Sequence, residues 1–595
     1  MTTRRAGLIL TLSIMALGSS SGAAQDAGAT AARIEQQVLL TGGGGGAFVM
    51  SPKGEHLAAV VLRGSRSVVV YDGVDGPNFD EVASGANGTN VVFSSDGAHY
   101  GYVGRQGQEY VVMVDGKELA RGSPWMVPGL PYKSVDVFDF APAGSHFWYV
   151  IHSATGGIRP TWQMHVDAQP AEQASSDVVM PVFSPDGKHH AYVAAVRTGG
   201  TTHQALIVDG KPASYLGGNP QWTTDGLHLF TSVPVPRMNA VDVLVDGKPF
   251  MRAANVQLHM APIGSAVAAV VGVQGPNGAQ NFLTIGNKKM AGSDCTNIQG
   301  VFFSGDGKHI AMTCQSTPTD YWVWTDGKKG QSYQNVSSVL FATDGRAVYQ
   351  ASMNGKTFVV VGDHESDAYQ GIVPYPTSKA DQDEQRAHPV PAVVVGNHVG
   401  YVAMPTPAMG NNRFIVVDGK SVAAPAASDL RFSPDGSHYA YVTNAGVAED
   451  GVLLAGLGSG AMSTDFRKLA FSADGKHLAF PAFPAPDNSK HGMAIDGKYF
   501  PTDGMLPSGA TFTPDGKHLF WRGRSLTAPR ELIYLDGTKV LEIDQSTSLE
   551  NDADVYWSMG SDGVLTLVGQ DGNAMKRYRI TPGNSTLDGM VARAK

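Results

Sequence analysis

Ten of the eighteen histidines occupy one recurring position, two residues after a turn glycine. Imidazole can act near neutral pH as an acid, a base or a metal ligand. Because each of these histidines belongs to a different repeat, we expect them at the same height in separate structural units, too far apart to share one ion. We therefore predict packing or hydrogen-bonding roles for His56, His99, His146, His189, His228, His309, His398, His438, His477 and His518.

A second group of reactive side-chain types lies in or beside residues 364–392, the longest stretch outside the repeats. Acids, bases and metal-ligand types are all present there. Their spacing matches no defined site, so we expect a solvated charged loop and assign no catalytic residue, cofactor or metal. The residues concerned are His364, Glu365, Asp367, Asp381, Asp383, Glu384 and His388.

The elements that position these residues are set by an internal repeat. Apolar runs flank a Ser-Pro-Asp-Gly-type turn, as in FSPDGKHHAYV from Phe183 and FTPDGKHLFW from Phe512. This turn chemistry favours a hairpin whose glycine adopts the left-handed conformation. The turn glycines recur at intervals of 38 to 51 residues, at Gly54, Gly97, Gly144, Gly187, Gly226, Gly264, Gly307, Gly345, Gly396, Gly436, Gly475, Gly516 and Gly563.

A second signal, an apolar run ending in Asp-Gly-Lys, follows most of these turns, for example ALIVDGK ending at Lys211. Each unit thus contains two hairpins, or four short strands. The strands are apolar almost throughout, which indicates that both sheet faces are covered. A period near 40 residues without a sustained helical pattern predicts an all-β chain of about thirteen four-stranded propeller blades.

The paired motifs FSPDGKHHAYV and ALIVDGK resemble the TolB-type, WD-like propeller repeat of bacterial exported proteins, over nearly the whole chain after the leader. The resemblance implies a propeller fold. That family includes binding subunits, propeller domains of prolyl-oligopeptidase-like peptidases and some sugar lyases, so it does not fix one function. TolB itself has an additional N-terminal α/β domain, for which the roughly 25 residues between the leader and the first repeat leave no room.

Thirteen blades exceed the four to eight of one ring, so we expect tandem propellers. Our preferred division is seven plus six, with a first propeller over residues 25–335 and a second over 336–595. The alternative is eight plus five, with 364–392 as the linker. Because the last repeat supplies only three strands, the segment Ile34 to Leu40 is a candidate for its fourth.

Residues 1–24 are typical of a cleaved secretory signal, with Arg4 and Arg5 before an apolar stretch. A Gly-x-Ser-x-Gly motif, which is typical of the nucleophile turn of serine hydrolases, falls within this leader at residues 18–22 and therefore indicates no hydrolase domain. No later apolar run is long enough for a membrane span, so we expect a periplasmic or secreted protein. The formal charge of −9, without a basic tail, argues against nucleic-acid binding.

The only two cysteines, Cys295 and Cys314, flank one predicted hairpin and could form a disulfide in an oxidising compartment. Counting outward from the turn at Asp306 places them about four residues out of register. That offset leaves both the bonded and the free state open.

The loops between the second and third strands vary, whereas the other turns are short and uniform. Variable loops on a rigid scaffold commonly carry recognition, and Arg and Trp are frequent interface anchors. We expect a monomeric, non-enzymatic scaffold that binds an envelope or extracellular protein or a glycan. The alternative is a lyase or hydrolase of carbohydrate polymers. Candidate partner-face residues are Arg63, Arg105, Trp162, Arg197, Arg237, Arg413, Arg522 and Arg524.

Overall fold

The structure is a computed structural model of the chain. It describes residues 32–41, 48–83, 91–122, 126–127, 130–131, 135–153, 161–167, 169, 181–198, 201–213, 218–235, 238–275, 278–373, 392–405, 412–454, 457–459, 469–484, 490–504, 507–525, 530–544, 555–572 and 574–593. The signal peptide predicted at 1–24 lies outside these residues.

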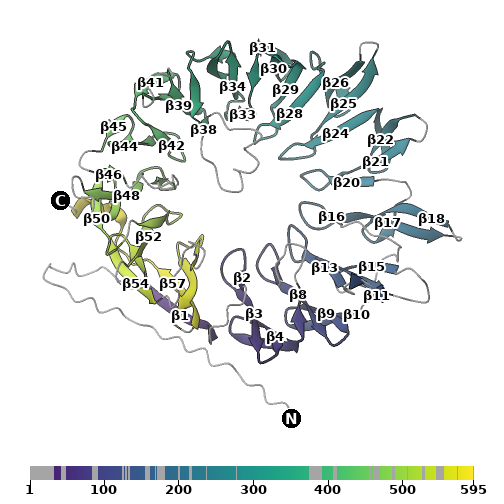
Figure 1. The fold of residues 1–595 in the computed structure, drawn as a ribbon, viewed down its shortest axis with the longest axis horizontal. Coiled ribbons are helices and arrows are strands. Elements are labelled where there is room, and N and C mark those ends of the chain that lie inside the picture. The colour runs from purple at the N-terminus through teal and green to yellow at the C-terminus, as the bar shows by residue number, and fades with distance from the viewer. Residues whose placement is uncertain are drawn as a thin grey trace. The chain divides into compact units, whose positions relative to one another are not determined.

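The chain divides into two compact units. The first comprises the described residues of Gly44–Pro318 and Val323–Gln331, and the second those of Met1–Gly43, Thr319–Trp322 and Ser332–Lys595. Within each unit the antiparallel sheets follow one another in chain order (Figure 1).

Among its described residues, the first unit contains six blades, most of a seventh and a separate hairpin of β11 (Met126–Val127) and β12 (Leu130–Pro131); residues 319–322 and 332–333 of the seventh blade are assigned to the second unit. Blade by blade, its strands are β2 (Phe48–Met50), β3 (Leu57–Arg63), β4 (Arg66–Tyr71) and β5 (Val74–Phe79); β6 (Glu81–Val82), β7 (Val92–Phe93), β8 (Tyr100–Gln106), β9 (Glu109–Val114) and β10 (Lys117–Gly122); β13 (Val135–Phe140), β14 (Phe147–Ser153) and β15 (Thr161–Val166); β16 (Val182–Phe183), β17 (His190–Thr198), β18 (Thr201–Val208) and β19 (Lys211–Pro212); β20 (Gly218–Trp222), β21 (Leu229–Val235), β22 (Ala240–Val245) and β23 (Lys248–Ala253); β24 (Asn255–Met260), β25 (Val267–Gly275), β26 (Gly278–Ile285) and β27 (Lys288–Lys289); β28 (Asn297–Phe303), β29 (Ile310–Thr317), β30 (Asp320–Thr325) and β31 (Lys328–Tyr333).

The second unit contains six blades and one helix, α2 (Leu587–Arg593), among its described residues. Its strands are β32 (Asn335–Val336), β33 (Leu340–Phe341), β34 (Ala347–Met353), β35 (Lys356–Val361) and β36 (His364–Glu365); β37 (Gly371–Val373), β38 (Val393–Val395), β39 (His398–Met404), β40 (Phe414–Val417) and β41 (Lys420–Ala423); β42 (Ser428–Phe432), β43 (Tyr439–Thr443), β44 (Gly446–Glu449) and β45 (Val452–Leu453); β46 (Leu457–Ser459), β47 (Ala470–Phe471), β48 (Leu478–Pro484), β49 (Gly492–Ile495) and β50 (Lys498–Pro501); β51 (Ser508–Phe512), β52 (Leu519–Arg524), β53 (Arg530–Leu535) and β54 (Thr538–Asp544); β55 (Val555–Met559), β56 (Leu565–Asp571), β57 (Ala574–Thr581) and β1 (Arg33–Thr41).

The sequence prediction of an all-β fold with thirteen four-stranded propeller blades is confirmed for the described residues. Where a sheet has five strands, its first strand is broken into two pieces that pair with the same neighbour, as β6 and β7 do with β8. How the blades are grouped into rings stays a prediction.

The turn glycines are required where neighbouring blades approach each other. Gly187 has a φ of 73°, and its N–H donates to the Ser184 carbonyl over 2.8 Å. A Cβ there would lie 2.1 Å from the carbonyl oxygen of Ala143, in the preceding blade. Any other residue at this position would meet both a clash and a disfavoured conformation.

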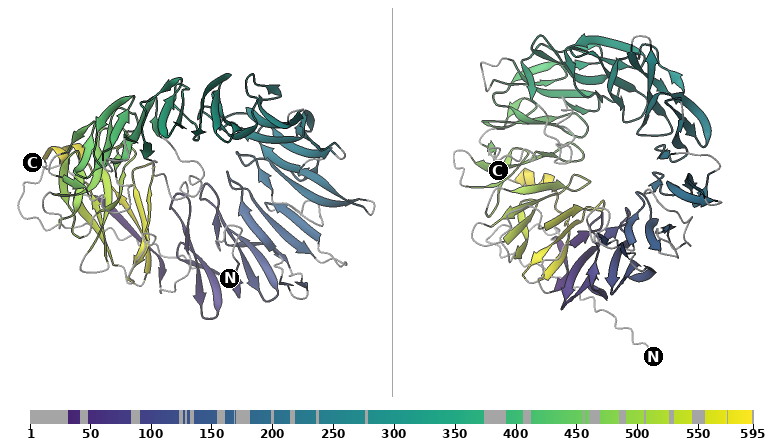
Figure 2. Two further views of the ribbon diagram at one scale, coloured as in Figure 1. Left: turned by 45° about the horizontal axis from the view of Figure 1, so that its top comes forward. Right: turned by 45° about the vertical axis from the view of Figure 1, so that its right-hand side comes forward.

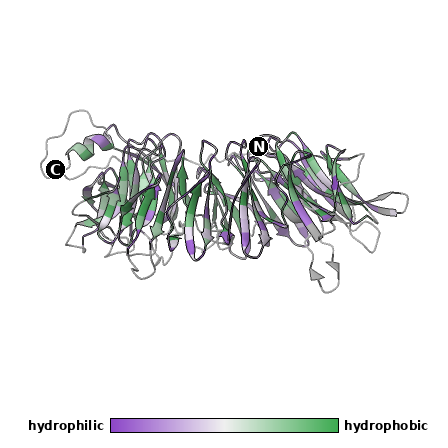
Figure 3. Ribbon diagram, turned by 90° about the horizontal axis from the view of Figure 1, so that it is seen from above, coloured by the Kyte–Doolittle hydropathy of each residue, from purple (hydrophilic) through white to green (hydrophobic). Residues whose placement is uncertain are grey.

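Consecutive blades bury their apolar faces against each other, so the core is a series of layers within each unit. In the first unit, Ala58 and Val69 of one blade pack against Tyr102 and Met113 of the next. Hydrophobic residues accordingly colour much of the length of the strands (Figure 3).

The last blade takes its fourth strand from the beginning of the chain. Strand β1 pairs antiparallel with β57, with Ile34 opposite Ile580 and Thr41 opposite Ala574. In Figures 1 and 2 the purple β1 lies beside the yellow β57. The segment Ile34 to Leu40, singled out in the sequence, thus completes this sheet and covers an edge that would otherwise be open.

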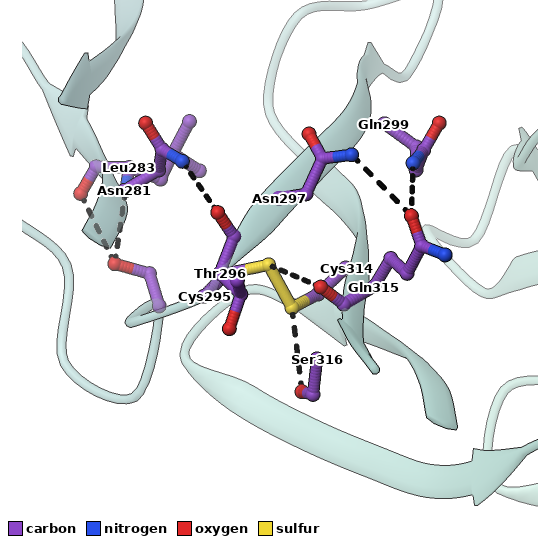
Figure 4. The surroundings of a disulfide bond; sticks show 10 residues. Asn281, Leu283, Cys295, Thr296, Asn297, Gln299, Cys314, Gln315 and Ser316 are labelled. Atoms are coloured by element: carbon purple, nitrogen blue, oxygen red, sulfur yellow. Dashed lines mark hydrogen bonds between the residues drawn. A yellow bond between two sulfur atoms is a disulfide. The ribbon is translucent and has the colours of Figure 1, made fainter. Parts of the chain in front are cut away.

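A disulfide joins Cys295 to Cys314, with 5.9 Å between their Cα atoms (Figure 4). A bulge between Ile298 and Gly300 places Ile298 opposite Cys314, so Cys295 lies three residues before the paired position. Cys295 exchanges two backbone hydrogen bonds of 2.8 Å with Asn281 of the preceding blade. The bond therefore ties two adjacent blades together.

Helix α2 follows the last strand and packs on apolar residues of the two preceding blades. Leu587 is fully buried in a cluster with Phe500 and Leu519, and Met590 packs against the same cluster. No helix in the described part of the chain is long and apolar enough to cross a membrane.

Candidate functional site

The ten repeat histidines each bind an aspartate of the same blade. In the blade β20–β23, His228 Nδ1 lies 2.8 Å from Asp246 Oδ2, and the Leu229 N–H donates to Asp246 Oδ1 over 2.9 Å. One carboxylate thereby joins the turn after the first strand to the turn after the third. We call this arrangement the His–Asp brace. Its ten pairs are His56–Asp72, His99–Asp115, His146–Asp167, His189–Asp209, His228–Asp246, His309–Asp326, His398–Asp418, His438–Asp450, His477–Asp496 and His518–Asp536.

The aspartates of the brace are the first residues of the turns after the third strands, and in nine of the ten blades a glycine follows; Asp167 is followed by Ala168. All ten have positive φ, between 46° for Asp536 and 55° for Asp167. Aspartate tolerates this left-handed conformation better than most residues, and its short carboxylate can bond to nearby backbone groups. The Asp-Gly motif is therefore explained by two requirements, a tight turn and a histidine partner.

The blades that lack the histidine also lack the aspartate. In β24–β27 and β32–β36, the positions of the aspartate are taken by Gly286 and Gly362, whose N–H groups donate to the equivalent carbonyls, those of Val267 and Ala347. The histidine and the aspartate are absent from the same blades. We infer that each residue type is present as the hydrogen-bond partner of the other. The expectation of a hydrogen-bonding role for the repeat histidines is confirmed.

A serine or threonine supports most of the histidines from the other side. In β42–β45 the Ser433 hydroxyl accepts the His438 N–H over 3.0 Å and donates to Asp435 over 2.6 Å. That donated bond is the main cause that lowers the pKa of Asp435 to about 2, and Ser472 does the same for Asp474. The hydrogen bonds within each turn thus favour the ionised carboxylate.

Two braces hold their histidine in a setting that favours its charged form. The hydrogen bond to Asp450 raises the pKa of His438, and the bond to Asp496 raises that of His477 against the opposing effect of burial. His477 is 7% exposed, and its Nε2 lies 3.4 Å from Asp588 of helix α2. Asp474 adds a further negative charge near the ring.

We expect the second unit to lose stability as the pH rises above about 6.5. A raised histidine pKa stabilises the fold fully below the unfolded value near 6.5, and this contribution disappears as the pH rises through the folded value. Melting temperatures of wild type and His477→Gln on both sides of this value measure the effect; the variant should show a shallower decline. Asp588→Asn, which keeps the Asp496 bond, should begin its decline at the same pH but complete it at lower pH, with a smaller total loss. Parallel profiles for all three proteins would contradict the expectation.

The second turns, between the second and third strands, lie at the opposite edge of each blade from the braces. Two of the predicted partner-face arginines near them pair with carboxylates of their own chain. Arg63 forms two hydrogen bonds of 3.1 Å with Asp75. Arg105 donates to the Gly107 carbonyl over 3.0 Å and lies 3.6 Å from Asp80. Both side chains remain partly exposed.

Three further predicted arginines contact other groups of their own chain. Arg413 donates to the Ala427 carbonyl over 2.7 Å. Arg522 lies over the ring of Trp557, 5.9 Å from its centroid, and Arg524 lies 4.0 Å from Glu531. The buried Nε atoms of Arg413 and Arg522 have no hydrogen-bond partner among the described residues.

The remaining predicted residues are less completely described. Arg237 lies outside the described residues. The backbones of Trp162 and Arg197 belong to β15 and β17, and their side chains lie outside what is described. Of the group at 364–392, Asp381, Asp383, Glu384 and His388 also lie outside it.

The described members of that group do not converge. His364 and Asp367 are exposed, whereas Glu365 accepts a 2.5 Å hydrogen bond from the Tyr333 hydroxyl. Burial, assisted by this bond, raises the pKa of Tyr333. No group of three or more His, Cys, Asp or Glu side chains in the described part of the chain could hold a metal ion.

Comparison with known proteins gives likenesses of structure only. No family model and no curated protein matches the chain. Similar solved structures include a eukaryotic initiation factor (12% identity, 74% of this chain and 96% of that chain, TM-score 0.27) and TolB from Acinetobacter baumannii (17%, 46% and 78%, 0.19). Another is the β-propeller domain of the Trilobed protease from Pyrococcus furiosus (12%, 47% and 94%, 0.21). These likenesses assign no activity or partner to this chain.

Proposed function

We propose that this protein is an exported, non-enzymatic scaffold that binds a protein partner through the second-turn edge of its blades. The contrast between the two edges carries the proposal. The edge of the first and third turns is uniform and tied by the brace in ten blades. The second turns differ widely, from the short link between Arg63 and Arg66 to the long one between Met404 and Phe414.

A braced edge makes each of the ten blades that carry the brace a stable platform for the loops at its other end. The brace fixes two of the three turns in a blade, so sequence differences in the second turn need not disturb the packing of the strands. Recognition commonly resides in such loops on a rigid scaffold. Arginines at the loop ends, such as Arg63 and Arg105, supply charge that can bind carboxylates of a partner.

Two further features support export. Residues 1–24 have the pattern of a secretory signal, and the chain's two cysteines form a disulfide. Disulfides persist mainly in oxidising compartments such as the periplasm or the extracellular space. We therefore place the partner in one of these compartments.

The test compares two variants of the second unit. In the loop variant, the connections 405–413, 485–491 and 525–529 are each replaced by Asn-Gly. The control, Lys476→Ala with Lys517→Ala, changes exposed lysines on the braced edge of two of the same blades. Proteins captured from envelope extract by the wild type are identified, purified and titrated by calorimetry. We expect the loop variant to bind at least about tenfold more weakly and the control to bind as the wild type does.

Equal binding by the loop variant, with unchanged circular dichroism and melting, would overturn the proposal. Capture of a polysaccharide instead of a protein would overturn the assigned class of partner. Shortening of a polysaccharide by the wild type, lost in the variant His364→Ala with His388→Ala, would favour the enzymatic alternative.

A further inference from the structure

Helix α2 covers an apolar patch at the braced edge of the blades β46–β50 and β51–β54. Its first residue, Leu587, is fully buried in a cluster that includes Phe500 and Leu519 of these blades, and Met590 and Val591 pack against the same cluster. In Figure 3 the helix lies beyond the ends of the strands, next to the label C. Without the helix, these blades would expose the patch to water.

The helix is too short to be stable without its contacts to the blades. It has seven residues, including Gly589, whereas isolated helices need about 12–15 residues in water. Besides the apolar contacts, the Leu587 N–H donates to the Lys517 carbonyl over 2.8 Å, and the Lys498 ammonium donates to the Val591 carbonyl. Ordering such a segment costs a free energy of the same order as that gained by burying a few apolar side chains. We therefore expect the helix to open locally while the blades stay folded.

His477 lies between a carboxylate of its own blade and a carboxylate of the helix. Its Nδ1 is 2.7 Å from Asp496 Oδ2, and its Nε2 is 3.4 Å from Asp588 Oδ1. The residue is 7% exposed, and its ring stacks on Phe512 with 6.5 Å between the ring centroids. A change in the charge of this ring therefore acts directly on the contact between blade and helix.

Only the charged form of this ring suits both carboxylates. Imidazolium has an N–H donor on each nitrogen, so it can donate to Asp496 and to Asp588 at the same time. The neutral ring has one donor. When the proton stays on Nδ1, which keeps the shorter contact with Asp496, the lone pair of Nε2 faces Asp588 and repels it. Loss of one proton thus weakens the contact with the helix and keeps the bond within the blade.

Further charged groups surround the ring of His477. On its own turn, Asp474 adds negative charge, and the Lys476 ammonium lies 3.0 Å from Asp474 Oδ2 and also interacts with Asp588. On the preceding blade, Glu449 interacts with Asp496, and burial raises the pKa of Glu449. The ring is therefore set among more negative than positive charges, which favours its protonated form.

The charged groups of the blade β51–β54 pair mainly with one another. Lys517 lies 3.5 Å from Asp515, and His518 Nδ1 lies 2.7 Å from Asp536. On the helix itself, the side chain of Arg593 lies outside what is described. Histidine is the side-chain type whose ordinary pKa lies between pH 5 and 8. Of the two histidines near α2, His477 is the one with the helix carboxylate beside its ring.

We propose that α2 is a pH-dependent latch, which charged His477 holds on the apolar patch and which opens more often when this histidine is neutral. Because the contact with Asp588 exists only in the closed state, closing raises the proton affinity of the ring. The closed state is therefore favoured most below the pKa of His477 in the open state, and this advantage is lost as the pH rises through the pKa in the closed state. The patch lies at the edge opposite the second turns, so the latch does not depend on the partner surface proposed above.

The test attaches a nitroxide spin label to the full chain with the substitution Ala592→Cys. Ala592 is exposed, and the two native cysteines are joined in a disulfide, so without a reducing agent the label reacts with the new cysteine alone. The ratio of mobile to immobilised label in the electron paramagnetic resonance spectrum reports the ratio of open to closed helix. We expect this ratio to rise about threefold from pH 5.5 to pH 8.5, the effect of losing one exposed ion pair.

Three variants of the labelled chain isolate the contact. Asp588→Asn keeps the bond between His477 and Asp496 but places an uncharged amide, both donor and acceptor, beside the ring, so the ratio should hardly change with pH. His477→Gln removes the titrating group and should give the same result. The matched control is His518→Gln, which alters the brace of the neighbouring blade and should keep the rise seen in the wild type.

A ratio that stays constant with pH in the wild type would overturn the proposal, and so would an undiminished rise in Asp588→Asn. Asp588 has an exposed side chain, so this variant should fold even if His477→Gln does not, and circular dichroism checks the blades of both. A rise that is lost equally in His518→Gln would indicate general loosening of the braced edge and would also overturn the latch.

Discussion

Replacing Trp521 by alanine is expected to lower the free energy of unfolding of the second unit by about 3–5 kcal/mol. Trp521 is fully buried in the layer between two blades and stacks on Tyr534, with 5.5 Å between ring centroids and 3° between planes. Its indole N–H donates to the Thr502 hydroxyl over 3.3 Å. The substitution removes a large apolar group where strands on both sides prevent collapse.

Urea unfolding followed by circular dichroism measures this loss, and Trp521→Phe is its control. Phenylalanine keeps most of the apolar volume and loses the bond to Thr502, so we expect a cost below about 2 kcal/mol. A loss under 1 kcal/mol for the alanine variant would show that the layer between these blades repacks easily, contrary to the tight packing described.

Removal of the disulfide by Cys295→Ala with Cys314→Ala should destabilise the first unit by about 2–4 kcal/mol. The bond closes a loop with a sequence separation of 19 and joins the segment paired with Asn281 to strand β29. Without the bond the unfolded chain has more conformational entropy, and two adjacent blades lose the covalent link between them.

The chain has two cysteines, so a reducing agent acts on this bond alone. Dithiothreitol should lower the unfolding midpoint of the wild type to that of the double variant and leave the variant unchanged. Cys295 and Cys314 are 5% and 0% exposed, so reduction should be slow in the folded protein. Identical midpoints of oxidised and reduced wild type would contradict the stabilising role.

The blades were predictable because their signals are local. A turn such as Ser184 to Gly187 specifies its own hairpin, and an Asp-Gly-Lys sequence specifies the next. The pairing of β1 with the last repeat could also be predicted. That repeat supplies only three strands and needs a fourth, and the strand-like segment near the N-terminus belongs to no other repeat.

The sequence pattern alone does not indicate the His–Asp brace, although it contains both of its members. His228 and Asp246 stand in different hairpins, and their contact depends on how two turns meet in space. The signal that could have revealed it is their joint absence: Gly286 and Gly362 replace the aspartate only in blades that also lack the histidine. A comparison of all repeats at both positions would have predicted the pair.

The contact between His477 and helix α2 could not be derived from the sequence. It depends on the path of the chain after Thr581 and on the seven-residue helix α2, too short to give a sustained periodic pattern. Neither is encoded in the repeat that contains His477. Departures from the repeat, not the repeat itself, created this contact.

Strand β1 has a consequence for how the molecule is made. It leaves the ribosome before every other described strand, yet the partner that completes its hydrogen bonds, β57, is the last described strand to follow. Until β57 has been made, β1 has an unpaired edge able to pair with other polypeptides. In a truncated product that stops before residue 574, the edge of β1 would have no partner strand. Premature termination should therefore yield aggregates and not a slightly smaller soluble protein.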